Sequence, residues 1–187
     1  MTPFTRVEGR AYPLPLDNVD TDLIIRAEHL KTIGRSGLGR HAFEVIRATF
    51  GNVFDDPQYA GAPIIVALDN FGCGSSREHA AWALADMGVR AVVAASFSDI
   101  FAGNAFKNGI AAVELDRPAA ETLLETAKTH TIAVDLAQMT VTSVAGHLFT
   151  FAMDPFRREC LLAGIDEIAL TLAFEPAITA YEQKMGI

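Results

Sequence analysis

Two short, continuous apolar segments constrain the fold most strongly, because each is followed by a turn and then by a helical pattern. The segments are 64–68 and 91–95, and both have the length of a strand that is buried on both faces. The first leads through a glycine-rich turn into a predicted helix over 77–87, which Gly88 would end. Strand, turn, helix and next strand in this order predict parallel βα units.

The rest of the chain adds helices and a hairpin to these units. The parallel part continues through three more predicted elements: a short helix near 99–108, a strand at 111–115 and a helix at 118–128. Between 132 and 151 the hydrophobic period changes to two, and Ala145-Gly146 provides a tight turn, which predicts a hairpin. The first sixty residues should be loops between short strands, and the tail 154–181 should be helical in short pieces. We therefore expect an α/β fold with a mixed sheet.

Length and composition indicate one globular domain spanning 1–187. Half of the 187 residues are hydrophobic and 20% are charged, which excludes intrinsic disorder. The 15 basic and 23 acidic residues give a net charge of −8, which argues against a nucleic-acid partner. No stretch reaches the roughly 18 apolar residues of a membrane span, and the N-terminus lacks a secretory signal pattern, so we expect no membrane partner and a cytoplasmic location.

The two cysteines, Cys73 and Cys160, are too few for most cysteine-based sites. They form neither a CxxC pair nor a Cys/His zinc spacing, and free thiols are favoured over a single long-range disulfide. An iron–sulfur cluster needs three or four thiolates, which this chain does not have. We therefore expect the chain itself to bind neither a metal ion nor a cluster.

The densest candidate site is the octapeptide Gly72-Cys73-Gly74-Ser75-Ser76-Arg77-Glu78-His79. Two glycines one residue apart let the backbone approach a ligand, and the helix start that follows presents free N–H groups to an anion. Arg77 adds a planar guanidinium that matches a carboxylate. The spacing fits neither a P-loop nor a dinucleotide-binding turn. The pattern indicates a carboxylate or phosphate site.

A purely structural role fits the same residues. Ser75 and Glu78 match a capping box, in which the serine caps the helix and the glutamate reaches back to the backbone. Arg77 favours a bound anion instead, because a cation at a helix N-terminus opposes the helix dipole. The residue pattern leaves both interpretations open.

Two further segments are weaker candidates. Asp17, Asp20 and Asp22 could suggest calcium, but their spacing is not that of an EF-hand loop, so a turn or a helix cap is favoured. The glycine-rich loop 34–40 carries two arginines, and on its own it is typical of an exposed connection.

Taken together, four segments closely resemble the small subunits of 3-isopropylmalate dehydratase, which correspond to the swivelling C-terminal β/β/α domain of the aconitase family. They are 17–25, 70–80, 96–101 and 106–109, and the likeness continues through 156–166 to 181–182. The resemblance covers almost the whole chain. It implies an aconitase-type swivel domain and a hydro-lyase that isomerises 2-isopropylmalate and 3-isopropylmalate in leucine biosynthesis.

The resemblance also assigns roles to residues of the candidate site. Ser75 matches the serine that removes the carbon-bound proton of the substrate, which favours catalysis over capping, and Asp22 matches an active-site acid. Three residues of the turn match substrate-binding positions: Gly74, Ser76 and Arg77. Arg35 lies one residue out of register with the second substrate arginine of the family.

The resemblance further implies a [4Fe–4S] cluster held by a larger partner subunit, an active site between the two chains, and a small di- or tricarboxylate substrate. One departure concerns specificity, because Arg26 stands where the family usually has proline. Apolar walls from Leu30, Ile33 and Leu38 would suit an isopropyl group, whereas Arg26 and Arg35 could serve a third carboxylate. A related dehydratase, of the citramalate (2-methylmalate) or homoaconitate type, and a stand-alone carboxylate-binding module are the alternatives.

Overall fold

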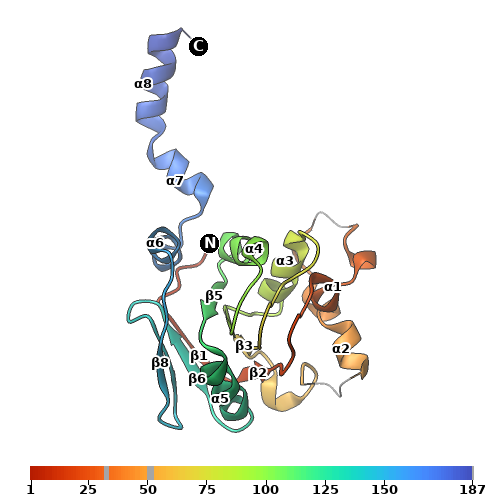
Figure 1. Ribbon diagram of the computed structural model, residues 1–187. Coiled ribbons are helices and arrows are strands. Elements are labelled where there is room, and N and C mark those ends of the chain that lie inside the picture. The colour runs from red at the N-terminus through yellow and green to blue at the C-terminus, as the bar shows by residue number, and fades with distance from the viewer. Residues whose placement is uncertain (32–33, 50–52, 187) are drawn as a thin grey trace.

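The computed structural model describes residues 1–31, 34–49 and 53–186, and within them the strands form two separate sheets (Figure 1). The four parallel strands are, in sheet order, β2 (Ala11–Pro13), β3 (Ile64–Val66), β4 (Ala91–Ala94) and β5 (Ala111–Glu114). In their register, Ile65 of β3 lies between Tyr12 and Val92. The two apolar segments of the sequence therefore form the central strands of a parallel sheet, as predicted.

The second sheet is antiparallel. In sheet order its strands are β1 (Arg6–Gly9), β6 (Ile132–Asp135), β7 (Thr140–Ser143) and β8 (Leu148–Thr150). Gly146, with φ of +93°, lies in the turn between β7 and β8, so the predicted hairpin is confirmed. The predicted combination of parallel and antiparallel strands is present, but the two kinds are divided between two sheets. The reason is that β6 pairs with β1, which only Arg10 separates from β2 along the chain.

The helices that surround the parallel sheet begin close to the predicted positions. The three helices of the βα units are α3 (Glu78–Asp86), α4 (Asp99–Lys107) and α5 (Arg117–Ala127). The first sixty residues add α1 (Thr21–Ile24), α2 (Glu44–Thr49) and the 3-10 turns η1 (Ala27–His29), η2 (Gly39–His41) and η3 (Pro57–Tyr59). Asp116 caps α5 by accepting a hydrogen bond from the backbone N–H of Ala119 (2.9 Å), and a proline follows in the first turn.

Two hydrophobic cores lie on opposite faces of the parallel sheet. Ile65 and Val92 face a core shared with α1, α2 and α3, whereas Ile64, Val66 and Val93 face a core shared with α5 and the antiparallel sheet. Figure 1 shows the same order of layers, with the antiparallel sheet on one side and α1 to α3 on the other. The residues of β3 and β4 alternate between the two cores, which explains why both strand segments are apolar at every position.

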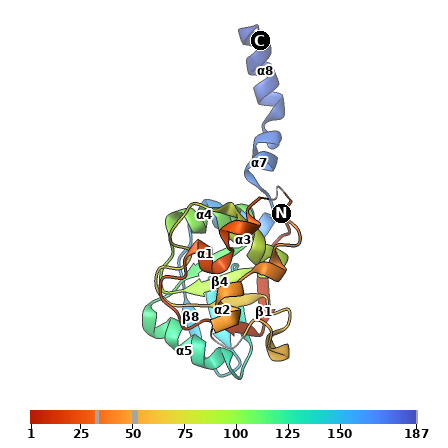
Figure 2. The same ribbon diagram turned by 90° about the vertical axis from the view of Figure 1, so that its right-hand side faces the viewer.

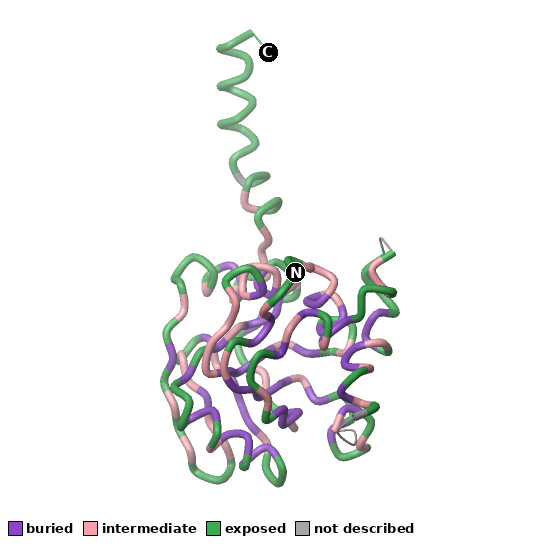
Figure 3. The backbone as a smooth tube through the Cα atoms, turned by 45° about the vertical axis from the view of Figure 1, so that its right-hand side comes forward, coloured by how far each residue is buried: buried purple, intermediate pink, exposed green. Residues whose placement is uncertain are grey.

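The C-terminal segment leaves this body as an arm (Figures 1 and 2). After α6 (Pro155–Ala163), α7 (Glu167–Ala173) is held by partly buried Leu170 and by an ion pair between Lys107 and Glu167 (3.7 Å). The last helix, α8 (Glu175–Met185), is exposed throughout (Figure 3). No helix in the described part of the chain is long and apolar enough to span a membrane. The assignment of 1–187 to one domain stays a prediction.

Candidate active site

The glycine-rich turn lies at the carboxyl ends of β3 and β4, where an open parallel sheet commonly binds its ligand. Backbone hydrogen bonds join it to both neighbouring segments. They run from Phe71 N to Ser96 O (3.0 Å), from Ser98 N to Phe71 O (3.0 Å), from Gly72 N to Val19 O (2.7 Å) and from Thr21 N to Cys73 O (3.0 Å). Three of the segments that carry the family resemblance are therefore held together at one edge of the sheet.

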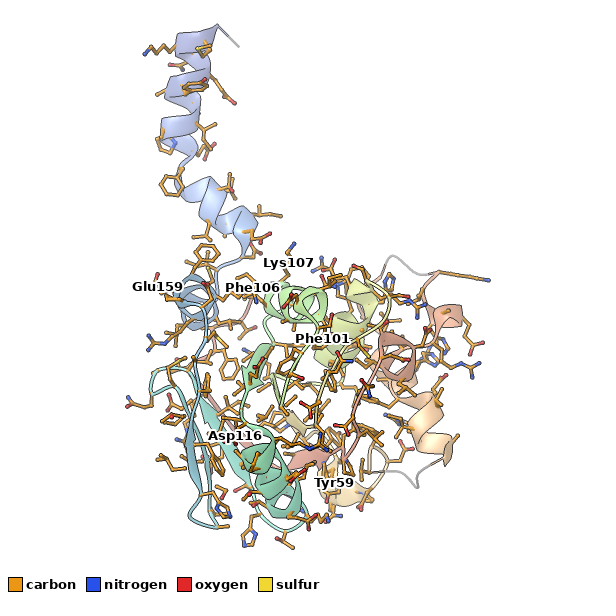
Figure 4. All side chains as sticks on the ribbon, viewed as in Figure 1. Tyr59, Phe101, Phe106, Lys107, Asp116 and Glu159 are labelled. Carbon is orange, nitrogen blue, oxygen red and sulfur yellow. The ribbon has the colours of Figure 1, made fainter. Side chains whose placement is uncertain are left out.

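Both glycines of the turn have a structural requirement for glycine. Gly72 has φ of +76°, and a Cβ atom there would lie 2.1 Å from Cγ of Phe101 in α4, a side chain labelled in Figure 4. Gly74 has φ of +86° and faces Asp20, with only 3.4 Å between its Cβ position and the Cβ of the aspartate. A side chain at Gly72 would collide with the core, and both positions favour the left-handed backbone that glycine adopts without strain.

The three aspartates of 17–22 have different roles. Asp20 caps α1, because its carboxylate accepts a hydrogen bond from Leu23 N (2.7 Å), so the predicted cap is confirmed there. Asp17 accepts a hydrogen bond from Asp69 N (3.0 Å) and pairs with Arg117 (2.8 Å). That pairing, through the hydrogen bond from Arg117 above all, holds the pKa of the Asp17 carboxyl below its usual value. The calcium alternative has no support in this arrangement, since all three carboxylates are already engaged, that of Asp22 by Arg77.

Asp22 faces Arg77 instead of the backbone. Its carboxylate forms an ion pair with the guanidinium of Arg77, although the two residues are 55 positions apart in sequence. The arginine side chain is 19% exposed and the aspartate side chain is 55% exposed. The structure thus brings two residues of the predicted site together, with the cation largely shielded and its partner open to solvent.

Ser75 does not cap α3, so the capping-box interpretation is wrong. The residue that precedes the helix is Arg77, in an extended conformation and without a side-chain cap. The carbonyl of Ser75 accepts a hydrogen bond from Thr21 Oγ1 (3.0 Å), which holds this residue in the turn and delays the helix until Glu78. The carboxylate of Glu78 accepts hydrogen bonds from Trp82 (3.1 Å) and Asn108 (3.1 Å) rather than reaching back.

The hydroxyls of Ser75 and Ser76 make no hydrogen bond to any residue that the structure describes, and both residues are exposed. They lie directly before the first turn of α3, whose N–H groups have no side-chain cap. Amide groups at a helix start carry partial positive charge, and Arg77 adds a full positive charge. The arrangement can bind a carboxylate and can stabilise negative charge on a serine oxygen.

Cys73 lies beside the site but is not activated. Burial raises the pKa of its thiol, and the charge of Asp20 raises it further. A thiol with a raised pKa stays protonated at neutral pH, which does not suit a metal ligand or a nucleophile. Both cysteines are free, and Cys160 lies in the core that α5 shares with the antiparallel sheet.

Arg35 lies beside α3, near Glu78, which directly follows the glycine-rich turn 72–77 (the serine turn). Its guanidinium stacks over the ring of Trp82, 5.1 Å from the centroid, and the described contacts give it no hydrogen bond to Ser75, Ser76 or Arg77. The structure thus places Arg35 near the start of α3 without contact to the serines, and its role as the second substrate arginine stays a prediction. Arg26 is exposed and pairs with Glu28 (3.1 Å).

The apolar walls expected from the loop 26–40 are only partly present. Leu38 is buried in the core, and Leu30 packs against that core, whereas Ile33 lies outside the described residues. A shallow hollow does lie beside Asp22. It is lined by Asp22, Arg26, Ala27, Glu28 and Val45.

Sequence reasoning missed a cluster of two histidines and a glutamate next to this hollow. His29 Nε2 lies 2.9 Å from one carboxylate oxygen of Glu44, and His41 Nδ1 lies 2.6 Å from the other. Burial raises the pKa of Glu44, but hydrogen bonds from His29 and His41 outweigh it, so that the pKa lies below its usual value. No motif spacing signals this cluster, because it joins residues of three separate loop and helix segments.

Comparison with known proteins gives one consistent result. The family model described as the aconitase C-terminal domain matches residues 1–118. The 3-isopropylmalate dehydratase small subunit of Novosphingobium aromaticivorans is 56% identical over 185 residues, which cover 99% of this chain and 92% of that protein. The small subunit of Zymomonas mobilis is 60% identical over 180 residues, covering 96% and 94% respectively.

A solved structure agrees with these sequence relatives. It is a 3-isopropylmalate dehydratase from Methanocaldococcus jannaschii, which superposes with a TM-score of 0.71 at 28% sequence identity. The match covers 95% of this chain and 99% of that chain. Sequence and fold therefore point to the same group of proteins.

Proposed function

This chain belongs to the family of 3-isopropylmalate dehydratase small subunits, and we propose that it joins a larger subunit to interconvert 2-isopropylmalate and 3-isopropylmalate in leucine biosynthesis. The predicted family, aconitase-type fold and enzyme class are thereby confirmed. The observation that carries the proposed chemistry is the exposed hydroxyl of Ser75 in front of α3, which forms no hydrogen bond with any described residue and lies close to Arg77 in sequence.

In this proposal Ser75 is the base that removes the carbon-bound proton of the substrate. A serine hydroxyl is a weak base unless its alkoxide is strongly stabilised. The uncapped N–H groups at the start of α3 and the charge of Arg77 provide this stabilisation. The absence of a capping hydrogen bond supports the role, because the oxygen is not already committed to the helix.

Arg77 and Ser76 would bind a substrate carboxylate at the same turn, with the backbone of Gly74 leaving room for it. The pair of Arg77 with Asp22 supports this role, since the guanidinium already holds one carboxylate in this position. A substrate carboxylate that takes this place would release Asp22, which then lies beside the reacting centre as an acid. Arg35 would have to leave Trp82 to take part, so we give it no role in the first binding step.

The residues of this chain do not fit an iron–sulfur cluster. The sequence has two cysteines, of which Cys73 lies in the glycine-rich turn and Cys160 lies in α6, buried in the core shared with the antiparallel sheet. A [4Fe–4S] cluster, which would act as the Lewis acid for the departing hydroxyl group, belongs in our proposal to the larger subunit. The two free thiols also support a cytoplasmic location, because disulfides are rare in that reducing compartment.

The C-terminal arm supports the proposed partner. In and just before α8, Phe174, Ile178, Tyr181 and Met185 follow each other at the spacing of one helix face, and all are exposed. An isolated helix of this length is only marginally stable in water. An apolar stripe of this kind is typical of a surface that another protein covers.

The substituent of the substrate is proposed to be the isopropyl group. Arg26 is already paired with Glu28 and exposed, so an apolar substituent does not leave an unpaired buried cation behind. Ala27 and Val45 line the hollow beside Asp22 and can contact an isopropyl group. The charged Arg26 on the same hollow is the feature that would serve a third carboxylate instead.

Reconstitution tests the proposal directly. The purified chain should be inactive alone and should become a dehydratase when mixed with its cluster-bearing partner. Full activity of the isolated chain would contradict the two-subunit proposal. Failure to recover any cluster-bearing partner by co-purification from cell extract would favour a stand-alone carboxylate-binding module.

A matched pair of variants tests the roles at the turn. Ser75→Ala should lower kcat by several orders of magnitude with little change in KM, because the base acts only in the chemical step. Ser76→Ala, the neighbouring exposed serine, should mainly raise KM. Equal and small effects of both substitutions would argue against a base at Ser75.

Substrate specificity is read from the same reconstituted enzyme. We expect kcat/KM to be highest for isopropylmalate, lower for citramalate and lowest for homocitrate. A higher value for homocitrate would overturn the isopropyl assignment, yet it would leave the serine base intact.

A further inference from the structure

The cluster of His29, His41 and Glu44 presents three metal-ligating atoms to one point. One ring nitrogen of each histidine and one carboxylate oxygen of Glu44 lie within 4.8 Å of one another, and the two rings stack with centroids 3.9 Å apart. The three side chains are only partly exposed, at 20%, 27% and 31%. A convergent, half-buried group of two imidazoles and one carboxylate is the donor set of many zinc sites.

A zinc ion would require the two stacked rings, whose planes differ by 19°, to tilt apart, because an imidazole nitrogen binds a metal in the plane of its ring. At a Zn–N distance of about 2.0 Å, tetrahedral ligand atoms lie about 3.3 Å apart. The two N···O contacts to Glu44 are 2.6 Å and 2.9 Å, so an ion that replaces the hydrogen bonds widens both pairs slightly. Glu28, whose carboxylate lies 3.9 Å from His29 Nε2, is near enough to supply a fourth oxygen, and water can otherwise fill that position.

The hydrogen bonds define what must change when an ion enters. His41 Nε2 accepts a hydrogen bond from Nε of Arg40 (2.9 Å), which places the imidazole proton on Nδ1, facing Glu44. Coordination through Nδ1 moves that proton to Nε2, and the guanidinium of Arg40 must then turn away. The free-energy cost of this change is small, because the hydrogen bond between Arg40 and His41 is exposed to solvent.

We propose that His29, His41 and Glu44 bind one zinc ion. The ion would tie η1 to η2 and the start of α2, three segments otherwise joined here by hydrogen bonds. Glu28, which neighbours His29, and Val45, which neighbours Glu44, line the hollow beside Asp22. The ion therefore fixes the wall of the hollow without touching the serine turn. The zinc site and the catalytic role of Ser75 can each fail without the other.

Titration of the full-length chain with zinc chloride, after treatment with a chelator, tests the site. Calorimetry should show one ion bound per chain, and His29→Gln and His41→Gln should each weaken binding by at least about tenfold. This expectation follows because even second-shell partners of a metal site contribute 10- to 100-fold. Glu44→Gln, which preserves the shape and one hydrogen-bond acceptor, serves if a histidine variant folds poorly.

Two control variants make the result specific. His130→Gln removes an exposed histidine whose ring forms a hydrogen bond with Thr129, and Cys73→Ser removes the partly exposed thiol. Both should bind zinc as the parent chain does. Cobalt as a probe should give the visible absorption of a four-coordinate site in the parent chain and lose it in His41→Gln.

Three results would overturn the proposal. They are the absence of stoichiometric binding, equal affinities in the parent chain and the His29→Gln, His41→Gln and Glu44→Gln variants, and loss of binding only in Cys73→Ser. In each case the cluster only joins three segments through hydrogen bonds and is not a metal site.

Discussion

Gly72 is the residue at which the serine turn meets the core, and Gly72→Ala is expected to destabilise the protein strongly. The backbone there has φ of +76°, where an L-residue is strained. The new Cβ would also lie 2.1 Å from Cγ, 2.4 Å from Cβ and 2.7 Å from Cδ2 of Phe101. One of these atoms is the Cβ of Phe101, a buried residue, so the side chain cannot move aside without disturbing the core.

The expected loss has two parts. The left-handed backbone costs about 1–2 kcal/mol for a residue with a Cβ. Inserting a methyl group into a packed core costs typically about 1–3 kcal/mol more. Alanine also lowers the conformational entropy of the unfolded chain, and this effect offsets about 0.4–1 kcal/mol of the destabilisation. The net decrease in the free energy of unfolding should therefore be about 1–4.5 kcal/mol.

Gly61 provides the matched control. Its φ of +71° is nearly the same, but a Cβ there would meet no atom within 4 Å. Gly61→Ala shares the backbone strain and the unfolded-state effect, so the difference between the two variants isolates the collision with Phe101. Urea denaturation followed by circular dichroism should show Gly72→Ala to be less stable than Gly61→Ala by about 1–3 kcal/mol. Equal losses in the two variants would refute the argument that Phe101 requires glycine here.

Three further predictions concern the C-terminal arm, Glu78 and the proposed zinc site. Deletion of 175–187, an exposed segment where described, should change the free energy of unfolding by less than about 0.5 kcal/mol, yet abolish partner capture in a pull-down assay. The lowered pKa of Glu78 means that its stabilising contribution is present above its unfolded pKa and lost as the pH falls through the folded pKa. Urea midpoints of the parent chain and Glu78→Gln should therefore differ at pH 7 and converge in acid. Arg40→Ala should tighten zinc binding, because it removes the hydrogen bond that holds the His41 proton on Nδ1. Unchanged partner capture would contradict the first prediction, and a difference in urea midpoint that does not depend on pH would contradict the second. Weaker zinc binding by Arg40→Ala would contradict the third.

Local pattern was sufficient for the elements that depend on near neighbours in sequence. Strands β3 and β4 were predictable, because a strand buried on both faces must be apolar at every position. The turn at Gly146 and the end of α3 shortly before Gly88 were also predictable from local sequence, because glycine readily adopts the positive φ that both positions have. The order of strands and helices then required a parallel sheet.

The site itself was predictable as a motif but not as an arrangement. The sequence singled out the serine turn and Asp22, and the family resemblance gave them roles that are still to be tested. Pattern alone could not decide whether Ser75 caps a helix. That question is settled by a bond from Thr21, 54 residues away, which holds the turn open and starts the helix at Glu78.

Tertiary structure alone decided which distant residues meet. Asp22 pairs with Arg77, and Arg35 stacks on Trp82. Strand β6 pairs with β1 in a second sheet, and two histidines contact Glu44. None of these contacts follows from a local period or a short motif. Each depends on how the backbone places segments far apart in the chain, whereas hydrophobic period and backbone φ are properties of a few consecutive residues.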